Sequence, residues 1–208
     1  MAGKLMSRDH HNHAAHDALT QKRHILLTVL VINLAMFVLE IWQGMKSDST
    51  ALIADSMDFL SDSFSYLITL WVLASSLAVR ARAALVKAWL MMGLAALALA
   101  QGAHNLMHDA TPHAATMGWV GLLALIANVT SAALLYRTRD EDSNMQSVWL
   151  CSRNDAIANV AILIAAALVF ITESLWPDLM VALIITWLEA SAAIKIMRQA
   201  KKELRDGN

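Results

Sequence analysis

The segment HILLTVLVINLAMFVLEIWQG, residues 24–44, contains a single charged side chain, that of Glu40. A helix rises about 1.5 Å per residue, so a run of this length crosses the hydrocarbon core of a bilayer, which is about 30 Å thick. Its length and apolar character therefore predict a transmembrane helix.

Five more apolar runs of comparable length follow. Hydrophobic residues make up 58% of the chain and charged residues only 16%, which is more apolar surface than a soluble domain buries. Both prolines, Pro112 and Pro177, fall in joints between runs, where a missing N–H costs least. We expect an all-α, polytopic membrane protein with six transmembrane helices. The five further runs cover residues 50–76, 84–106, 116–136, 146–172 and 177–198.

The orientation follows from the basic residues. With six membrane crossings, fourteen of the sixteen Lys and Arg residues, including Lys87, lie on one side of the membrane. The two exceptions are Lys46 and Arg153. Cytoplasmic loops carry such an excess, so both termini should be cytoplasmic. Tryptophan prefers the membrane interfaces, and six of the seven tryptophans lie at predicted helix ends, Trp187 being the exception.

Three regions are expected on this basis. Residues 1–23 form a cytoplasmic tail that contains histidines, and residues 24–199 form the six-helix transport domain. Residues 200–208 form a short basic cytoplasmic tail, with no C-terminal regulatory domain.

Acidic residues interrupt two of the runs. Asp55, Asp58 and Asp62 are spaced by three and four residues, and Cys151 and Asp155 by four, so each set lies on one helical face. A charge in hydrocarbon costs roughly 2.5–3.5 kcal/mol, which indicates a function. Counted from opposite membrane surfaces at 1.5 Å per residue, Asp62 and Asp155 both reach the midplane. We predict a metal site formed by Asp58, Asp62, Cys151 and Asp155. Four ligands is the number that a tetrahedral zinc site requires.

These residues also have plainer interpretations. Acids inside a bundle pair with cations, and Arg153 either neutralises a carboxylate or extends to the cytoplasmic surface. A buried cysteine is often a small hydrophobic residue. Without Cys151, Asn154 or water would complete the ligand shell, and selectivity would move toward cobalt, nickel or iron; a thiolate favours zinc or cadmium.

The segment ALIADSMD, residues 51–58, followed by Asp62, resembles the second-helix signature of the cation diffusion facilitator family of metal–proton antiporters. The resemblance extends over most of residues 24–203. Further positions similar to the family are Glu40, Gly44, Ala127-Asn128 and Trp176-Pro177-Asp178.

The resemblance implies efflux of divalent transition-metal cations, zinc first and cadmium second, by proton-coupled alternating access. The metal would be the substrate, with no cofactor and no enzymatic activity. The implied partners are the metal ion, the proton, the lipid bilayer and a second copy in a homodimer, without nucleic acid. We expect a multi-pass protein of a bacterial inner (plasma) membrane.

Three features depart from the family pattern. Cys151 stands where the family usually has histidine, ahead of Asp155. The joint between the second and third helices is short. The cytoplasmic domain that usually follows the sixth helix is not expected here.

Secondary candidates remain open between two interpretations. Asp55 is a relay or a ligand on the outer route, and Glu40 and Glu189 join a proton route or contact polar neighbours. Histidines near the N-terminus collect zinc or belong to a polar tail, and a pair near the outer end of the third helix forms an exit site or is solvated. These histidines are His10, His11, His13 and His16, and His104 and His108.

The sequence lacks the residues that two other classes of membrane protein would need. A membrane cytochrome needs facing histidines within the bilayer, and a metalloenzyme needs a His-rich cluster on facing helices. A non-transporting partner subunit of a larger metal transporter remains an alternative.

Overall fold

The computed structural model is built from six α-helices. It describes the backbone of residues 2–71, 77–136 and 143–206, and the side chains of residues 20–70, 79, 81–136 and 149–205. No strand occurs in these parts of the chain, which confirms the all-α class. The helices are α1 (Ala2–Lys46), α2 (Thr50–Trp71), α3 (Leu77–His108), α4 (Ala114–Tyr136), α5 (Ser143–Thr172) and α6 (Trp176–Asp206).

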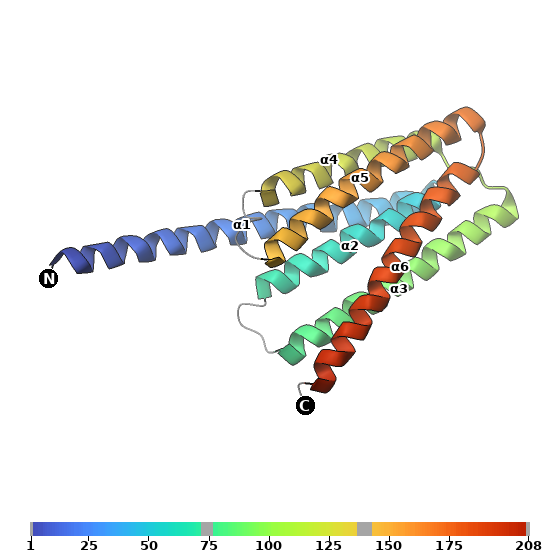
Figure 1. Cartoon of the computed structure of the whole chain (residues 1–208). Coiled ribbons are helices and arrows are strands. Elements are labelled where there is room, and N and C mark those ends of the chain that lie inside the picture. Colours follow the sequence, from blue (N-terminus) through green and yellow to red (C-terminus); the bar gives the residue numbers. More distant parts are fainter. Residues whose placement is uncertain (1, 72–76, 137–142, 207–208) are drawn as a thin grey trace.

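The helices pack as an elongated bundle (Figure 1). Helices α4 and α5 lie side by side, as do α3 and α6, and α1 packs along α2. Helix α1 begins and α6 ends at the same end of the bundle (Figure 1).

Among the described residues, five helices are long and apolar enough to cross a membrane. These spans are Thr20–Lys46, Ala81–His108, Ala114–Tyr136, Trp149–Thr172 and Trp176–Arg205. Helix α2 is not among them, although its 22 residues reach about 33 Å at 1.5 Å per residue. It differs from the other five because it carries Asp55, Asp58 and Asp62.

Helix α2 occupies the centre of the bundle. It contacts each of the other five helices, and every residue from 51 to 59 is buried. A helix buried on all sides meets protein rather than lipid. Its acidic residues therefore face other helices, which explains why its composition differs from that of its neighbours.

Helix α1 is longer than the predicted span. It begins at Ala2 and runs without interruption to Lys46, so residues 2–23, expected as a cytoplasmic tail, are helical and continue into the first span. No proline or glycine occurs between residues 4 and 43 to end it.

Three joints at one end of the bundle contain a residue in the same left-handed backbone conformation. Asp48, Asp109 and Glu173, which follow α1, α3 and α5, have positive φ angles of 53°, 49° and 49°. A residue in this left-handed region ends a helix and lets the following amide bond to the last turn. The Ala110 N–H accordingly donates to the Asn105 carbonyl over 2.9 Å. These short joints hold the helix ends together.

Candidate metal centre

The three aspartates of α2 share one buried face, as their spacing predicts. Asp55 is fully buried, and Asp58 and Asp62 are 9% and 5% exposed. Buried carboxylates need hydrogen-bond donors, protons or cations around them. What surrounds each one therefore indicates what the cluster can bind.

Asp62 connects α2 to α5. Its Oδ2 accepts a 2.8 Å hydrogen bond from the Tyr66 hydroxyl and a 3.4 Å bond from the Ser152 hydroxyl. The Tyr66 and Ser152 oxygens are themselves 2.8 Å apart. The sequence placed Asp62 and Asp155 at the same depth, and the structure joins Asp62 to α5 through Ser152, one turn before Asp155. Sequence analysis missed both Tyr66 and Ser152, because neither residue type is unusual in a helix.

Asp58 meets an acid from α6. The carboxyl groups of Asp58 and Glu189 interact directly, and Asp155 on α5 contributes a further negative charge. Asp58 Oδ1 and Glu189 Oε2 are buried and lack a hydrogen-bond donor among the described residues. Two interacting buried carboxylates repel each other, and a bound cation would offset this repulsion.

Asp55 forms a second acidic pair, with Glu40 of α1. Both side chains are fully buried, and no described donor reaches any of their four oxygens. Glu40 therefore lies beside Asp55 inside the bundle, and Glu189 lies beside Asp58.

Cys151 and Asp155 are less enclosed than the α2 acids. The side chain of Cys151 is exposed, and that of Asp155 is half-buried. No three His, Cys, Asp or Glu side chains of the described segments converge closely enough to hold a metal ion. The four predicted ligands thus lie around one region where α2 and α5 meet, but they do not form a preassembled tetrahedral site.

Arg153 does not face the carboxylates. Its guanidinium lies 5.4 Å from the ring centre of Trp149 and donates to Asn154 Oδ1 over 3.2 Å. Because the side chain is exposed, it belongs to the surface of α5. The cation that does approach the acids is Lys87 of α3, whose Nζ donates to Ser65 Oγ on α2 over 2.8 Å.

Asp178 holds the beginning of α2. Its carboxylate accepts hydrogen bonds from the Ser49 hydroxyl at 2.7 Å and from the backbone N–H groups of Thr50 at 2.8 Å and Ala51 at 3.1 Å. These N–H groups belong to the first turn of α2, where backbone N–H groups have no acceptor within the helix. An aspartate of α6 therefore caps α2 from another helix. The Trp-Pro-Asp sequence marked the start of α6, but nothing in it indicated this distant partner.

The secondary histidines fall into two groups. The side chains of His10, His11, His13 and His16 lie outside the described residues. On α3, the rings of His104 and His108 stack with centroids 4.4 Å apart, and both are exposed.

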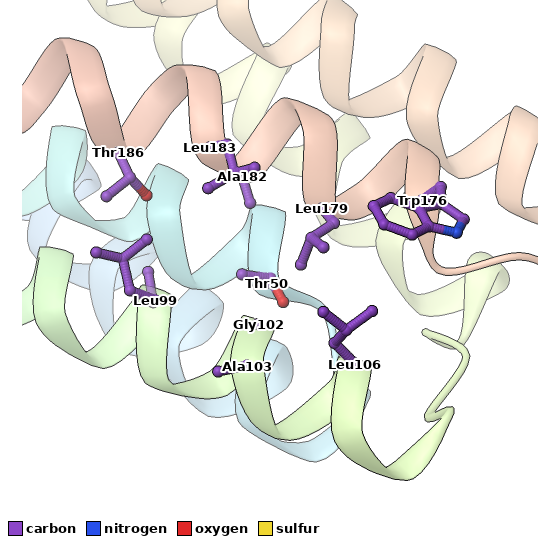
Figure 2. A pocket seen from close by; sticks show the side chains of 11 residues that line it. Thr50, Leu99, Gly102, Ala103, Leu106, Trp176, Leu179, Ala182, Leu183 and Thr186 are labelled. Atoms are coloured by element: carbon purple, nitrogen blue, oxygen red, sulfur yellow. The ribbon is translucent and has the colours of Figure 1, made fainter.

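A groove of about 310 Å³ lies apart from these acids, where α3 and α6 meet the start of α2 (Figure 2). Its lining is apolar except for Thr50 and Thr186, and Trp176 lies at one end. Without carboxylate or imidazole groups, it is not a metal site. A Cβ at Gly102 would lie 2.9 Å from Leu179 Cδ1 and would displace the end of that side chain.

The chain matches a known protein family over most of its length. Residues 26–204 match the family model described as the cation efflux transmembrane domain. No curated protein matches the chain. The matched region begins in α1, ends in α6 and contains every acidic residue of the cluster.

Proposed function

Because the chain belongs to the cation efflux family, whose members transport metal cations, we propose that it exports zinc, and also cadmium, from the cytoplasm in exchange for protons. The five apolar helices and the match over residues 26–204 make it a multi-pass membrane protein. The proposal adds α2 as a sixth span, both termini in the cytoplasm, a homodimer and a bacterial inner membrane.

The observation that carries the proposal is the concentration of buried carboxyl groups around α2. Asp58 and Asp62 come from α2, Asp155 from α5 and Glu189 from α6, and their charges interact. Carboxylate oxygens bind divalent cations, and Cys151 on the neighbouring face would add the sulfur that favours zinc and cadmium. Ionisable residues inside a membrane-spanning bundle typically mark pathways for ions or protons.

Proton exchange follows from the same crowding. A set of carboxyl groups with few donors retains protons when no metal is bound, and a metal binds only the ionised ligands. Entry of the metal therefore expels protons, and return of protons releases the metal. With opposite access for the two steps, the proton gradient supports export against an inside-negative potential, which costs about 2.3 kcal/mol per charge per 100 mV.

Metal binding also requires a rearrangement. Asp62 is held by Tyr66 and Ser152, and Cys151 is exposed on α5. Convergence of Asp58, Asp62, Cys151 and Asp155 on one ion would need a shift of α5 against α2. Such a shift is the movement that alternating access demands.

The test is metal-dependent proton flux in proteoliposomes that contain the purified chain alone. Zinc, cadmium, cobalt and manganese are supplied in turn to the wild type, to Asp58→Asn and to Asp109→Asn. Asp109 is a matched control because it is exposed and its positive φ angle suits asparagine.

We expect zinc and cadmium to drive flux in the wild type and in the Asp109 variant, and flux to fall to background in Asp58→Asn. Full flux in Asp58→Asn would remove Asp58 from the site. Flux driven by cobalt but not by zinc would change the substrate, and no flux in any reconstituted protein would favour a partner subunit.

A further inference from the structure

Lys87 brings a positive charge to the acidic cluster. Lys87 lies six residues after Ala81, where the apolar span of α3 begins, and a lysine this close to the end of a span normally extends to the membrane surface. The side chain instead turns toward α2, where Nζ donates to Ser65 Oγ over 2.8 Å. The Ser65 hydroxyl donates in turn to the Ser61 carbonyl over 3.1 Å, so its oxygen is free to accept from the ammonium.

This contact places the ammonium one helical turn from Asp62. Ser65 follows Asp62 by three residues, and residues three apart are neighbours on a helix surface. Helices α2 and α3 pack against each other, and the Lys87–Ser65 hydrogen bond joins them at this level. The groups whose charges interact with the ammonium come from α2, α5 and α6, and they are Asp62, Cys151, Asp155 and Glu189.

A fixed cation beside a cation site has two opposed effects. It compensates part of the negative charge of the empty site. The free-energy cost of holding these carboxylates in the low-dielectric interior is therefore lower while no metal is bound. The fixed cation also repels an incoming metal, so the bound ion is held less tightly and leaves sooner. Both effects depend on charge and not on the shape of the side chain.

We propose that Lys87 is the internal counter-cation of the acidic cluster and sets its affinity for the metal. The proposal rests on the proposed function, in which Asp58 and Asp62 bind the transported ion. Lys87 is an affinity-determining residue and not a ligand. Its removal should therefore strengthen metal binding, whereas removal of a ligand weakens it.

The experiment measures the dissociation constant of Cd²⁺ by titration calorimetry, with the full chain in nanodiscs at alkaline pH. Lys87→Gln removes the charge and keeps a donor for Ser65, and Lys87→Arg keeps the charge. Lys46→Met is the matched control, because Lys46 is exposed in the last turn of α1, at the other end of the bundle.

We expect Lys87→Gln to bind Cd²⁺ on the order of tenfold more tightly than the wild type, since one repulsive charge within a helical turn or two is lost. The dissociation constants of Lys87→Arg and Lys46→Met should stay within about twofold of the wild-type value. A change of that size is well below the effect of removing one interacting charge. Equal or weaker binding by Lys87→Gln overturns the proposal.

A second variant covers a failure of Lys87→Gln to fold. Ser65→Ala releases the ammonium from its anchor and should tighten Cd²⁺ binding in the same direction, by a smaller factor. Unchanged binding in Ser65→Ala, with Lys87→Gln unfolded, also overturns the proposal. A wild type that binds no Cd²⁺ would instead refute the proposed function.

Discussion

Replacement of Asp178 by alanine should destabilise the protein more than any other single change at a helix terminus. Asp178 is only 1% exposed and is the acceptor for the Ser49 hydroxyl and for the Thr50 and Ala51 amides. In Asp178→Ala these three donors, which are buried between α2 and α6, lose their acceptor. No other side chain of the described residues accepts a hydrogen bond from the Thr50 and Ala51 amides.

The magnitude follows from the two amides. A buried donor left without a partner costs about 1–3 kcal/mol, and bonds to a charged acceptor lie at the upper end of that range. Loss of an N-cap at an ordinary helix costs about 1 kcal/mol. We therefore expect Asp178→Ala to lower the free energy of unfolding by roughly 3–5 kcal/mol. Asp178→Asn retains one oxygen acceptor and should lose about half as much.

The assay is reversible unfolding in mixed micelles, followed by tryptophan fluorescence, for the wild type and each variant. Ser174→Ala is the matched control, because the Ser174 hydroxyl accepts from the Trp176 N–H at the start of α6 over 3.4 Å in an exposed position. Water replaces that acceptor, so the control should lose at most about 1 kcal/mol.

A loss below about 1 kcal/mol in Asp178→Ala, equal to that of Ser174→Ala, would refute the reasoning. It would mean that the first turn of α2 finds other acceptors and that Asp178 does not hold α2 in place. A large loss in both variants would show that the N-terminus of α6, and not the cap on α2, is the sensitive element.

Two further predictions concern packing and a second metal site. Gly44→Ala should lower the free energy of unfolding by about 1–3 kcal/mol, because the added Cβ would lie 2.8 Å from Ile53 Cγ1 and 3.0 Å from the Ile53 backbone nitrogen. Gly93→Ala should raise it by up to about 1 kcal/mol, since no atom lies within 4 Å of that Cβ and alanine favours a helix. The stacked pair His104 and His108 should bind one Cu²⁺ through two imidazole nitrogens, visible in the nitrogen hyperfine pattern of the EPR spectrum.

The checks on these two predictions use residues nearby. Equal stability of the Gly44 and Gly93 variants would contradict the close contact of α1 with α2. For the histidine pair, His113→Ala is the control, because its Nδ1 is 2.9 Å from Thr116 Oγ1 and the ring is already engaged. A Cu²⁺ signal that survives His104→Ala but disappears in His113→Ala would place the site elsewhere.

Several properties of the site were predictable, because they depend on neighbours along the chain. The spacing of Asp55, Asp58 and Asp62 defines one face wherever the helix lies. The depth of Asp62 and of residues 151–155 follows from counting residues, and the Ser152 contact to Asp62 agrees with it. The high cost of charge in hydrocarbon led to the prediction that this face is functional before any partner was known.

The partners themselves were not predictable. Lys87 was counted among cytoplasmic anchors, yet it lies against Ser65, and Asp178 was a motif residue, yet it caps a helix more than a hundred positions away in the sequence. Cys151 fitted the spacing of a ligand, but its side chain is exposed in the structure. Each outcome depends on how far a helix is rotated about its axis, which hydropathy does not specify.

By itself, the sequence determined the helical class, the segments long enough to span a bilayer and the acidic faces. Membrane insertion is a local property, because each run of about 20 residues meets the hydrocarbon independently of the others. Only the tertiary structure decided that α2 lies at the centre, that Glu40 pairs with Asp55 and Glu189 with Asp58, and which residues surround Asp62. Packing of helices against each other depends on side-chain shape and contact across distant segments, so it appears only when all six are assembled.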